Sequence, residues 1–184
     1  RMSDQNTIVD SDMTFAEAVF GSPAPVSIID TLSSVDVVYY SFDSVRHAGQ
    51  IVACAELEDD LYEIFAFLED IRFPVGKAIP IAAYSWNDDA SMADNNASSF
   101  NFRFIANTGK LSLHALGRAF DLNPVQNPVI YSAGLVAPPG ARYNPSASGA
   151  LSEHAPVVRE FLKRGWRWGG HFDEPKDYHH FEKP

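Results

Sequence analysis

The ten residues SLHALGRAFD, at positions 112–121, carry the strongest signal in this sequence of 184 residues. They place His114 seven residues before Asp121, with Gly117 between the two. Because a glycine permits a tight turn, a histidine before that turn and an aspartate on a strand after it can point at one place. Imidazole nitrogen and carboxylate oxygen are both zinc ligands. The segment therefore predicts two ligands of a metal site.

Positions 177–182, which read DYHHFE, can supply a third ligand. A catalytic zinc usually has three protein ligands and keeps one position for water. Neighbouring residues of a strand point to opposite faces, so only one of His179 and His180 can face the metal. The spacing from Asp177 and the Phe181 that follows favour His180. Asp177 stands three residues before it, where a carboxylate can take the proton of a metal-bound water.

Taken in order, these motifs resemble peptidase family M15, the zinc D-Ala-D-Ala carboxypeptidases and L-alanyl-D-glutamate endopeptidases of the VanY, VanX and phage-endolysin group. Residues 112–121 match the family pattern S-x-H-x-x-G-x-A-x-D, and residues 177–181 match D-x-x-H-F. A G-W-x-W-G-G segment usually precedes the second pattern and is found at 165–170. The closest branch is also similar in FNFR at 100–103 and in NPVQNP at 123–128.

The resemblance implies a role for each matched residue. The implied ligands of one zinc ion per chain are His114, Asp121 and His180. Asp177 matches the general base, Arg103 an arginine that stabilises the oxyanion or binds substrate, and Ser112 a serine that contacts substrate or supports the site. We add Arg142, in the predicted loop 138–149, as a cation that can bind the terminal carboxylate of a substrate.

Several of these residues also have a simpler interpretation. Asp121 alone can be an ordinary carboxylate at a strand end, and Asp177 can orient a ligand histidine instead of acting as base. Arg103 can form a structural salt bridge, and Ser112 can be a turn residue. Three further histidines lack a supporting pattern and are expected to be ordinary surface or core residues: His47, His154 and His171. The two tryptophans of the 165–170 segment, Trp166 and Trp168, are expected in the core.

The composition, 46% hydrophobic and 21% charged, is that of a globular protein. The formal net charge of −10 argues against binding nucleic acid or anionic lipid through bulk charge. The single cysteine, Cys54, rules out an internal disulfide and a cysteine-rich zinc site. No apolar run approaches the roughly 20 residues that span a bilayer, and no signal peptide is visible. The resemblance implies the bacterial cell envelope, periplasmic or secreted, and leaves the oligomeric state open.

The pattern of elements predicts an α+β fold with a mainly antiparallel sheet flanked by helices, and the resemblance implies the hedgehog and D,D-peptidase type. We expect one domain over 1–184, with a peripheral N-terminal extension at 1–34, of which 1–13 is irregular, and a catalytic core at 35–184. Helices are expected at 15–20, 58–71 and 152–164, strands at 35–42, 50–55, 79–84, 100–104, 118–122 and 179–182, and loops at 86–99 and 138–149.

The function expected first is hydrolysis of peptidoglycan stem peptides as a D-Ala-D-Ala carboxypeptidase. The alternatives are an L-alanyl-D-glutamate endopeptidase, acting as a lysin or toxin, and a hedgehog-like zinc-containing binding module without catalysis. The presence of Asp177 favours an enzyme over the binding module. The signatures of serine D,D-peptidases, serine hydrolases, HExxH metalloproteases and phosphate-binding loops are absent from the sequence.

Overall fold

The computed structural model describes residues 6–105 and 108–184, so the first five residues of the predicted N-terminal extension lie outside the described residues. The α-helices are α1 (Phe15–Val19), α2 (Val26–Ile29), α3 (Glu58–Asp70), α4 (Asp88–Ala93) and α5 (Pro156–Lys163). The 3-10 turns in these described ranges are η1 (Ala55–Leu57), η2 (Ile81–Tyr84), η3 (Leu113–Leu116) and η4 (Gly169–His171). Among the described residues, no helix has the length and apolar character needed to cross a membrane.

The strands are short except for the first hairpin. They are β1 (Ile8–Val9), β2 (Leu32–Tyr40), β3 (Arg46–Cys54), β4 (Lys77–Ala78), β5 (Asn96–Ala97), β6 (Ala119–Asp121), β7 (Val129–Ile130), β8 (Val136–Ala137), β9 (Arg167–Trp168), β10 (Lys176–Asp177) and β11 (His180–Glu182). Within the described ranges they form three sheets of three strands, ordered β1-β3-β2, β10-β7-β8 and β6-β11-β9, and the pair β4-β5.

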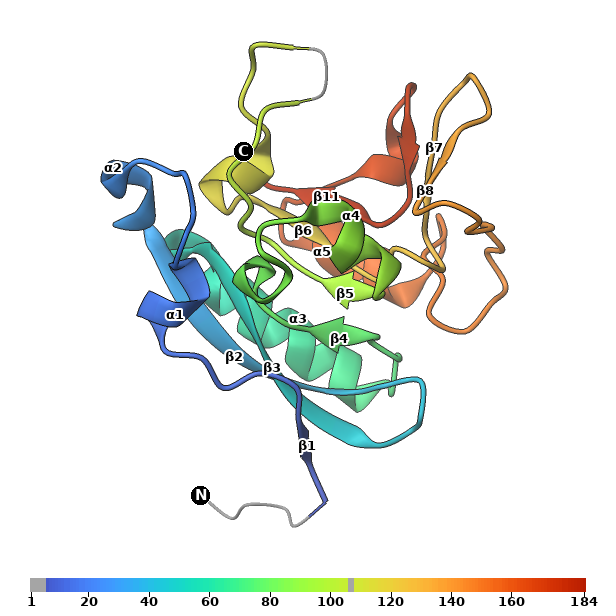
Figure 1. Cartoon of the computed structure of the whole chain (residues 1–184). Helices are drawn as coiled ribbons and strands as arrows, with labels where there is room; N and C mark the ends of the chain where they lie inside the picture. Colours follow the sequence, from blue (N-terminus) through green and yellow to red (C-terminus); the bar gives the residue numbers. More distant parts are fainter. Residues whose placement is uncertain (1–5, 106–107) are drawn as a thin grey trace.

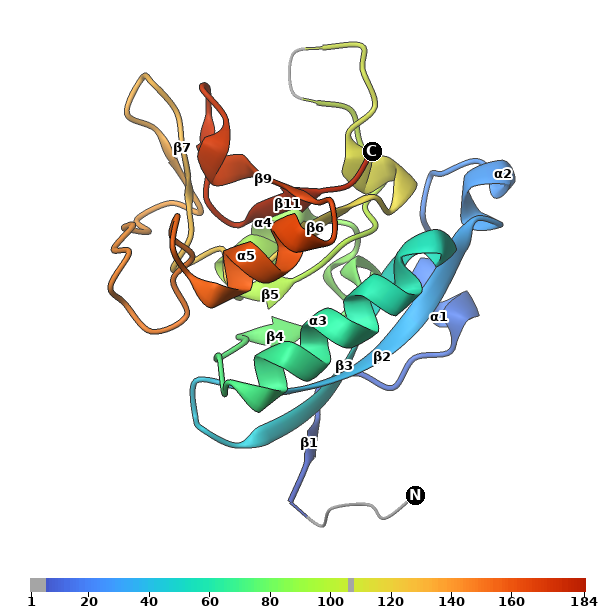
Figure 2. The same ribbon diagram turned by 180° about the vertical axis from the view of Figure 1, so that it is seen from behind.

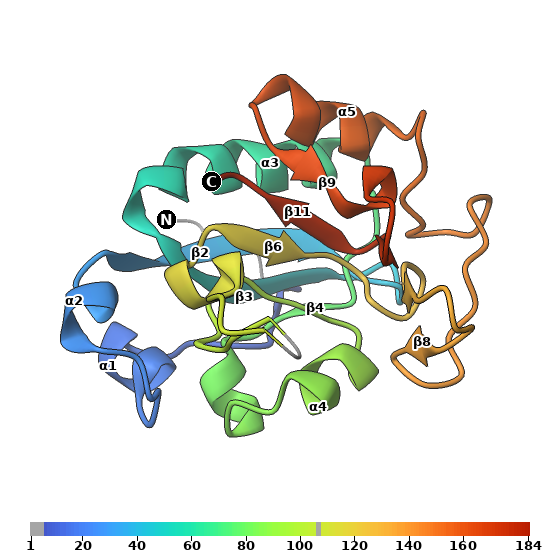
Figure 3. The ribbon, with the colours of Figure 1, turned by 90° about the horizontal axis from the view of Figure 1, so that it is seen from above.

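Most strand pairs are antiparallel; β1 with β3 and β4 with β5 are parallel. Figure 3 shows α3 and α5 on one side of the strands and α1 and α4 on the other. This mixed architecture of small sheets and few helices is consistent with the predicted α+β class. The predicted, mainly antiparallel sheet is divided into several small sheets, because turns and prolines break the chain after residue 77 into strands of only two or three residues.

The hairpin of β2 and β3 packs against α3, as Figure 2 shows from behind. The strands pair without interruption from Leu32 opposite Cys54 to Tyr40 opposite Arg46. The predicted helical periodicity is confirmed, since the buried residues of α3 are Leu61, Ile64, Phe65 and Leu68. Three acidic residues in the first turn of α3 interact favourably with the helix dipole.

A series of aromatic contacts carries this core into the C-terminal strands. The ring of Phe120 in β6 contacts Phe65 of α3 and stacks with Phe161 of α5, which in turn stacks on Phe181 of β11 at 3.7 Å between ring centres. Phe120, Phe161 and Phe181 are all fully buried. Because Phe120 and Phe181 point into the core, the residues beside them in β6 and β11 face the opposite side of the sheet. This alternation positions the site described below.

Both tryptophans of the 165–170 segment, Trp166 and Trp168, lie in the core as predicted, each 2% exposed. Figure 1 shows the C-terminal strands above the β2–β3 hairpin, with the β7–β8 hairpin projecting beside them. The loop expected at 138–149 has no helix or strand in the described chain.

Four local expectations were wrong. Residues 79–84 were expected as a strand and instead form η2 from Ile81 onward; Pro80 has no N–H to donate to a strand ladder. Residues 86–99, expected as a loop, contain α4 and β5. The side chain of Asn87 caps α4 by accepting from the Ala90 N–H. Residues 1–13 were expected to be irregular, yet Ile8–Val9 pairs with β3.

The fourth wrong expectation was a strand at 100–104. In the structure this stretch crosses between elements: the Phe100 N–H bonds Val52 of β3, and the Asn101 N–H bonds the carbonyl of His114. Only Phe104 makes a bridge, to Leu111, within the described residues. Long-range backbone partners of this kind leave no periodic trace in the local sequence.

Candidate metal centre

The local structure around His114 follows from its two neighbours in the motif. The Ser112 hydroxyl accepts a hydrogen bond from the His114 N–H at 3.2 Å and so caps η3. Gly117 ends η3 with φ +64°, and a Cβ at that position would lie 2.5 Å from the backbone nitrogen of Cys54. Only a glycine fits both the backbone angle and the space. The tight turn predicted from the sequence is therefore present, and it leads directly into β6 and Asp121.

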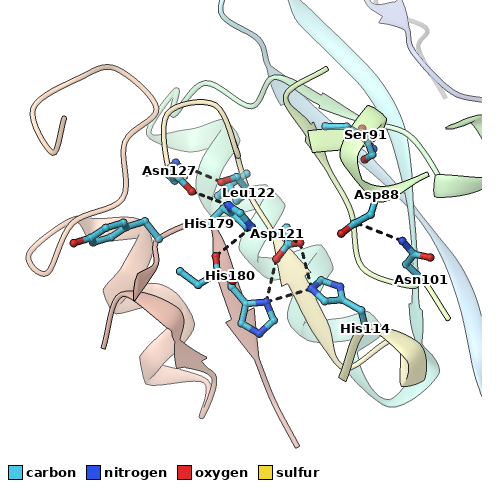
Figure 4. Close-up of polar contacts among 12 residues, drawn as sticks. Asp88, Ser91, Asn101, His114, Asp121, Leu122, Asn127, His179 and His180 are labelled. Carbon is cyan, nitrogen blue, oxygen red and sulfur yellow. Dashed lines mark hydrogen bonds and ion pairs between the residues drawn. The ribbon is translucent and has the colours of Figure 1, made fainter. Parts of the chain in front are cut away.

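Strand pairing brings the C-terminal histidine to the same place. In β6 and β11, His180 stands directly opposite Asp121, and directly opposed residues place their side chains on one face. The Oδ1 of Asp121 lies 3.1 Å from Nδ1 of His180, and its Oδ2 lies 3.2 Å from Nε2 of His114. The two imidazole nitrogens are 3.2 Å apart. Figure 4 shows the three side chains converging from η3, β6 and β11.

The outer atoms of both rings already have hydrogen-bond acceptors. Nδ1 of His114 lies 2.7 Å from the Ser99 carbonyl, and Nε2 of His180 lies 3.1 Å from Oε2 of Glu182. Both partners can only accept, so in the neutral rings these nitrogens carry the protons. Two lone pairs and a carboxylate then face one another, with ligand atoms all within 4.8 Å. Such a donor set fits a metal cation.

The pKa shifts of Asp121 and His180 indicate the same affinity for positive charge. Burial raises the pKa of Asp121, but the neighbouring histidines, His114 first, hold it well below its ordinary value. Burial lowers the pKa of His180, whereas its bonds to Asp121 and Glu182 raise it to about 10. Without a metal the site therefore retains a proton, which a bound metal has to displace.

Asp177, the predicted base, lies in β10 close to this trio. Its Oδ1 is buried and lies 3.1 Å from Nε2 of His179, but the alignment does not form a hydrogen bond. Oδ1 has no hydrogen-bond partner elsewhere in the described chain. The other ring nitrogen of His179 bonds the Asn127 carbonyl at 2.7 Å. His179 therefore lies beside Asp177, whereas His180 joins His114 and Asp121.

The predicted substrate-binding residues occupy three different surroundings. Arg103 reaches Asp88 of α4 at 3.4 Å, as in the salt-bridge interpretation, and its Nε finds no hydrogen-bond partner among residues 6–105 and 108–184. The hydroxyl of Ser112 faces the backbone of His114, which is a supporting role. Arg142 precedes Tyr143, whose ring stacks on Tyr178 at 3.7 Å. This stack attaches the Arg142 loop to the segment that carries Asp177 and His180.

Sequence reasoning did not single out two residues that lie at or beside the site. Asn127 is fully buried; its amide donates to the Gly149 carbonyl at 2.9 Å and accepts from the Leu151 N–H at 2.6 Å. It thereby fixes the carbonyl that holds His179. The signal was present in the repeated Asn-Pro of NPVQNP. Tyr131, in the β7–β8 turn, is the second: burial raises the pKa of its hydroxyl, the Asp177 charge raises it further, and the Arg103 charge lowers it.

Two histidines and an aspartate with a separate carboxylate nearby are a set of side chains that single-metal hydrolases use. Residues 106–183 match the family model described as D-alanyl-D-alanine carboxypeptidase. This match supports the resemblance to peptidase family M15 that the sequence motifs indicated. The match includes His114, Asp121, Asp177 and His180 and begins after Arg103. Neither a curated protein nor a solved structure matches the chain.

Proposed function

We propose that this peptidase is a zinc enzyme that hydrolyses peptide bonds in peptidoglycan stem peptides, as a D-alanyl-D-alanine carboxypeptidase. The observation that carries the proposal is the convergence of His114, Asp121 and His180 inside the segment that matches the carboxypeptidase family. Two imidazoles and one carboxylate suit zinc, whereas calcium and magnesium prefer sites made of oxygen alone. Stem peptides lie in the cell envelope, which is where the proposal places the enzyme.

A zinc ion held by His114, Asp121 and His180 would act as a Lewis acid and would lower the pKa of a water molecule towards about 7. The Asp177 carboxylate takes the proton of the attacking water and delivers it to the leaving amine. Its buried Oδ1, without a hydrogen bond in the described chain, supports this role because it is free to accept. Arg103, oriented by Asp88, stabilises the negative charge that develops on the scissile carbonyl oxygen.

A carboxypeptidase also needs a cation for the free carboxylate at the end of its substrate. We assign this role to Arg142. The support is the stack of Tyr143 on Tyr178, which ties the Arg142 loop to the strand segment of Asp177 and His180. An endopeptidase has no such requirement, because its substrate continues past the cleaved bond.

Zinc content tests the metal site. Protein purified and reconstituted with zinc should hold one equivalent, and His114→Ala should hold less than half. His154→Ala, which changes an exposed histidine outside the site, is the matched control and should keep the full equivalent. Full occupancy in His114→Ala would show that the ligands are other residues.

The products of digestion test the reaction. Purified muropeptides incubated with the zinc-loaded enzyme should lose a terminal alanine, which mass spectrometry detects. Cleavage between L-alanine and D-glutamate would instead establish the endopeptidase. If the zinc-loaded protein releases no product from any stem peptide, the proposed enzymatic activity is wrong and a binding module is the better assignment.

A further inference from the structure

Glu182 contacts His180, one of the three proposed metal ligands, and neither the motif nor the proposed reaction accounts for this contact. Its Oε2 lies 3.1 Å from Nε2 of His180. His180 and Glu182 are two residues apart in β11, so both side chains emerge on one face, whereas Phe181 between them is buried in the core. The contact therefore requires only that β11 be extended, and strand pairing with β6 and β9 ensures that.

The position of Glu182 excludes it as the base. It touches the ring nitrogen that points away from Asp121 and His114, on the far side of the imidazole. An ionised carboxylate can only accept a hydrogen bond, so this contact fixes the proton on Nε2. The lone pair is then left on Nδ1, the atom that faces Asp121 at 3.1 Å.

Glu182 is itself held in place from the neighbouring strand. Arg167 of β9 stands directly opposite it, and the Arg167 guanidinium donates to Oε1. The Glu182 side chain is 14% exposed, against 59% for Arg167. The carboxylate is thus mostly buried between an exposed cation and the His180 ring, and each of its oxygens has one partner. His114 has the opposite tautomer, because its Nδ1–H donates to the Ser99 carbonyl and the lone pair is left on Nε2.

We infer that Glu182, anchored by Arg167, is a positioning residue that selects the Nδ1 lone pair of His180 and strengthens it as a metal donor. Carboxylate partners of this kind orient a ligand histidine and raise its basicity, and their loss typically weakens metal binding about 10–100-fold. The inference rests on the proposed metal site, but it assigns Glu182 to metal affinity and not to proton transfer in the reaction.

Zinc affinity, measured by competition with a chromogenic chelator at one fixed pH, tests the inference in the full chain. We expect Glu182→Ala to weaken zinc binding about 10–100-fold and Glu182→Gln to weaken it less, because the amide oxygen still accepts from Nε2. Arg167→Gln should give a smaller loss than Glu182→Ala. Glu153→Gln is the matched control, because Glu153 also bonds a histidine, His171, that lies outside the trio. The zinc affinity of this variant should equal that of wild type.

A second measurement does not depend on how the variants fold. Long-range ¹H–¹⁵N spectra of the zinc-loaded wild type should show His180 protonated on Nε2 and bound through Nδ1. The reverse tautomer would overturn the inference, as would unchanged zinc affinity in both Glu182 variants when His180→Ala loses the metal. A wild type that binds no zinc would instead overturn the proposed function, so the two failures are distinct.

Discussion

At the scale of single residues, Asp177 is the side chain whose removal should separate metal binding from chemistry. We expect Asp177→Asn to keep its zinc, because Asp177 is not part of the converging trio. Turnover should fall about 10²–10⁴-fold, the usual contribution of a general acid–base group, since an amide cannot accept the proton. Zinc content and kcat on a stem pentapeptide are the measurements, with Asp173→Asn, an exposed neighbour, as control. Near-normal turnover would show that another group is the base.

The roles of Arg142 and Arg103 should be distinguishable by changing the C-terminal group of the substrate. With a free-acid and an amidated pentapeptide, wild type should strongly prefer the free acid. Arg142→Ala should lose about 10–100-fold of this preference, the equivalent of a hydrogen bond to a charged group at about 1.5–3 kcal/mol. Arg103→Ala should lower kcat for both substrates alike.

The control for these two variants is Arg159→Ala, which changes an arginine of α5 outside the site. It should leave both rates unchanged. If wild type cleaves the free acid and the amide equally well, the proposed carboxypeptidase activity is wrong and the endopeptidase activity is the better assignment.

At the scale of elements, the close contact of η4 with β10 limits where Asp177 can lie. A Cβ on Gly169 would meet the Asp177 carbonyl oxygen at 2.3 Å and its Cβ at 2.9 Å. We expect Gly169→Ala to displace β10 and to lower kcat about 10²-fold, because displacements of about 1 Å at a catalytic group have effects of that size. Zinc content should be retained. This contact gives a physical reason for the double glycine of the 165–170 motif.

The matched control adds the same methyl group where there is room. A Cβ on Gly109 would meet nothing within 4 Å. Gly109→Ala should therefore keep the stability and zinc content of wild type. If Gly169→Ala kept wild-type kcat as well, the position of Asp177 would not depend on this turn.

At the scale of the whole molecule, a polar network ties the N-terminal segment to the first hairpin. His47 of β3 bonds Asp10, which follows β1, at 2.9 Å and Asp43 of the β2–β3 turn at 3.0 Å. Tyr39 donates to Asp10 as well. Residues before the predicted core thus reach well into the sheet. The predicted boundary between extension and core at residue 35 stays a prediction.

This network predicts how stability depends on pH. Burial lowers the pKa of His47, but the bonds to Asp10 and Asp43 raise it above its ordinary value overall. A raised pKa in the folded state stabilises the protein fully below the unfolded value of about 6.5. That contribution is lost as pH rises through the folded pKa. We expect His47→Gln to cost about 1 kcal/mol at pH 6 and less at pH 8.

Urea unfolding of wild type and variant at the two pH values gives the difference directly. Comparing the two proteins at each pH cancels the titration of the metal site, which both share. His154→Gln, at an exposed histidine, should show no pH-dependent difference. A larger loss at pH 8 than at pH 6 would contradict the assignment of the raised pKa to His47.

The sequence by itself determined the features that depend on local pattern. The period of apolar residues predicted α3 and its buried face. The run rich in Val and Tyr at 35–42 predicted much of β2, and the run 50–55 predicted the second half of β3. Gly117 predicted the turn between His114 and Asp121, because both residues lie within a few positions of it. The spacing of the motifs also identified the set of residues that the structure brings together.

Only the tertiary structure decided how distant segments meet. The pairing of β11 with β6 places His180 opposite Asp121, across a separation of 59 residues, and that register has no local signature. The same pairing turns Glu182 towards the outer nitrogen of His180. Asn127, which is 52 residues before His179 in the sequence, fixes that histidine through a backbone carbonyl. These contacts depend on long-range packing of β-strands and loops, whereas periodicity and turn residues report only on neighbours along the chain.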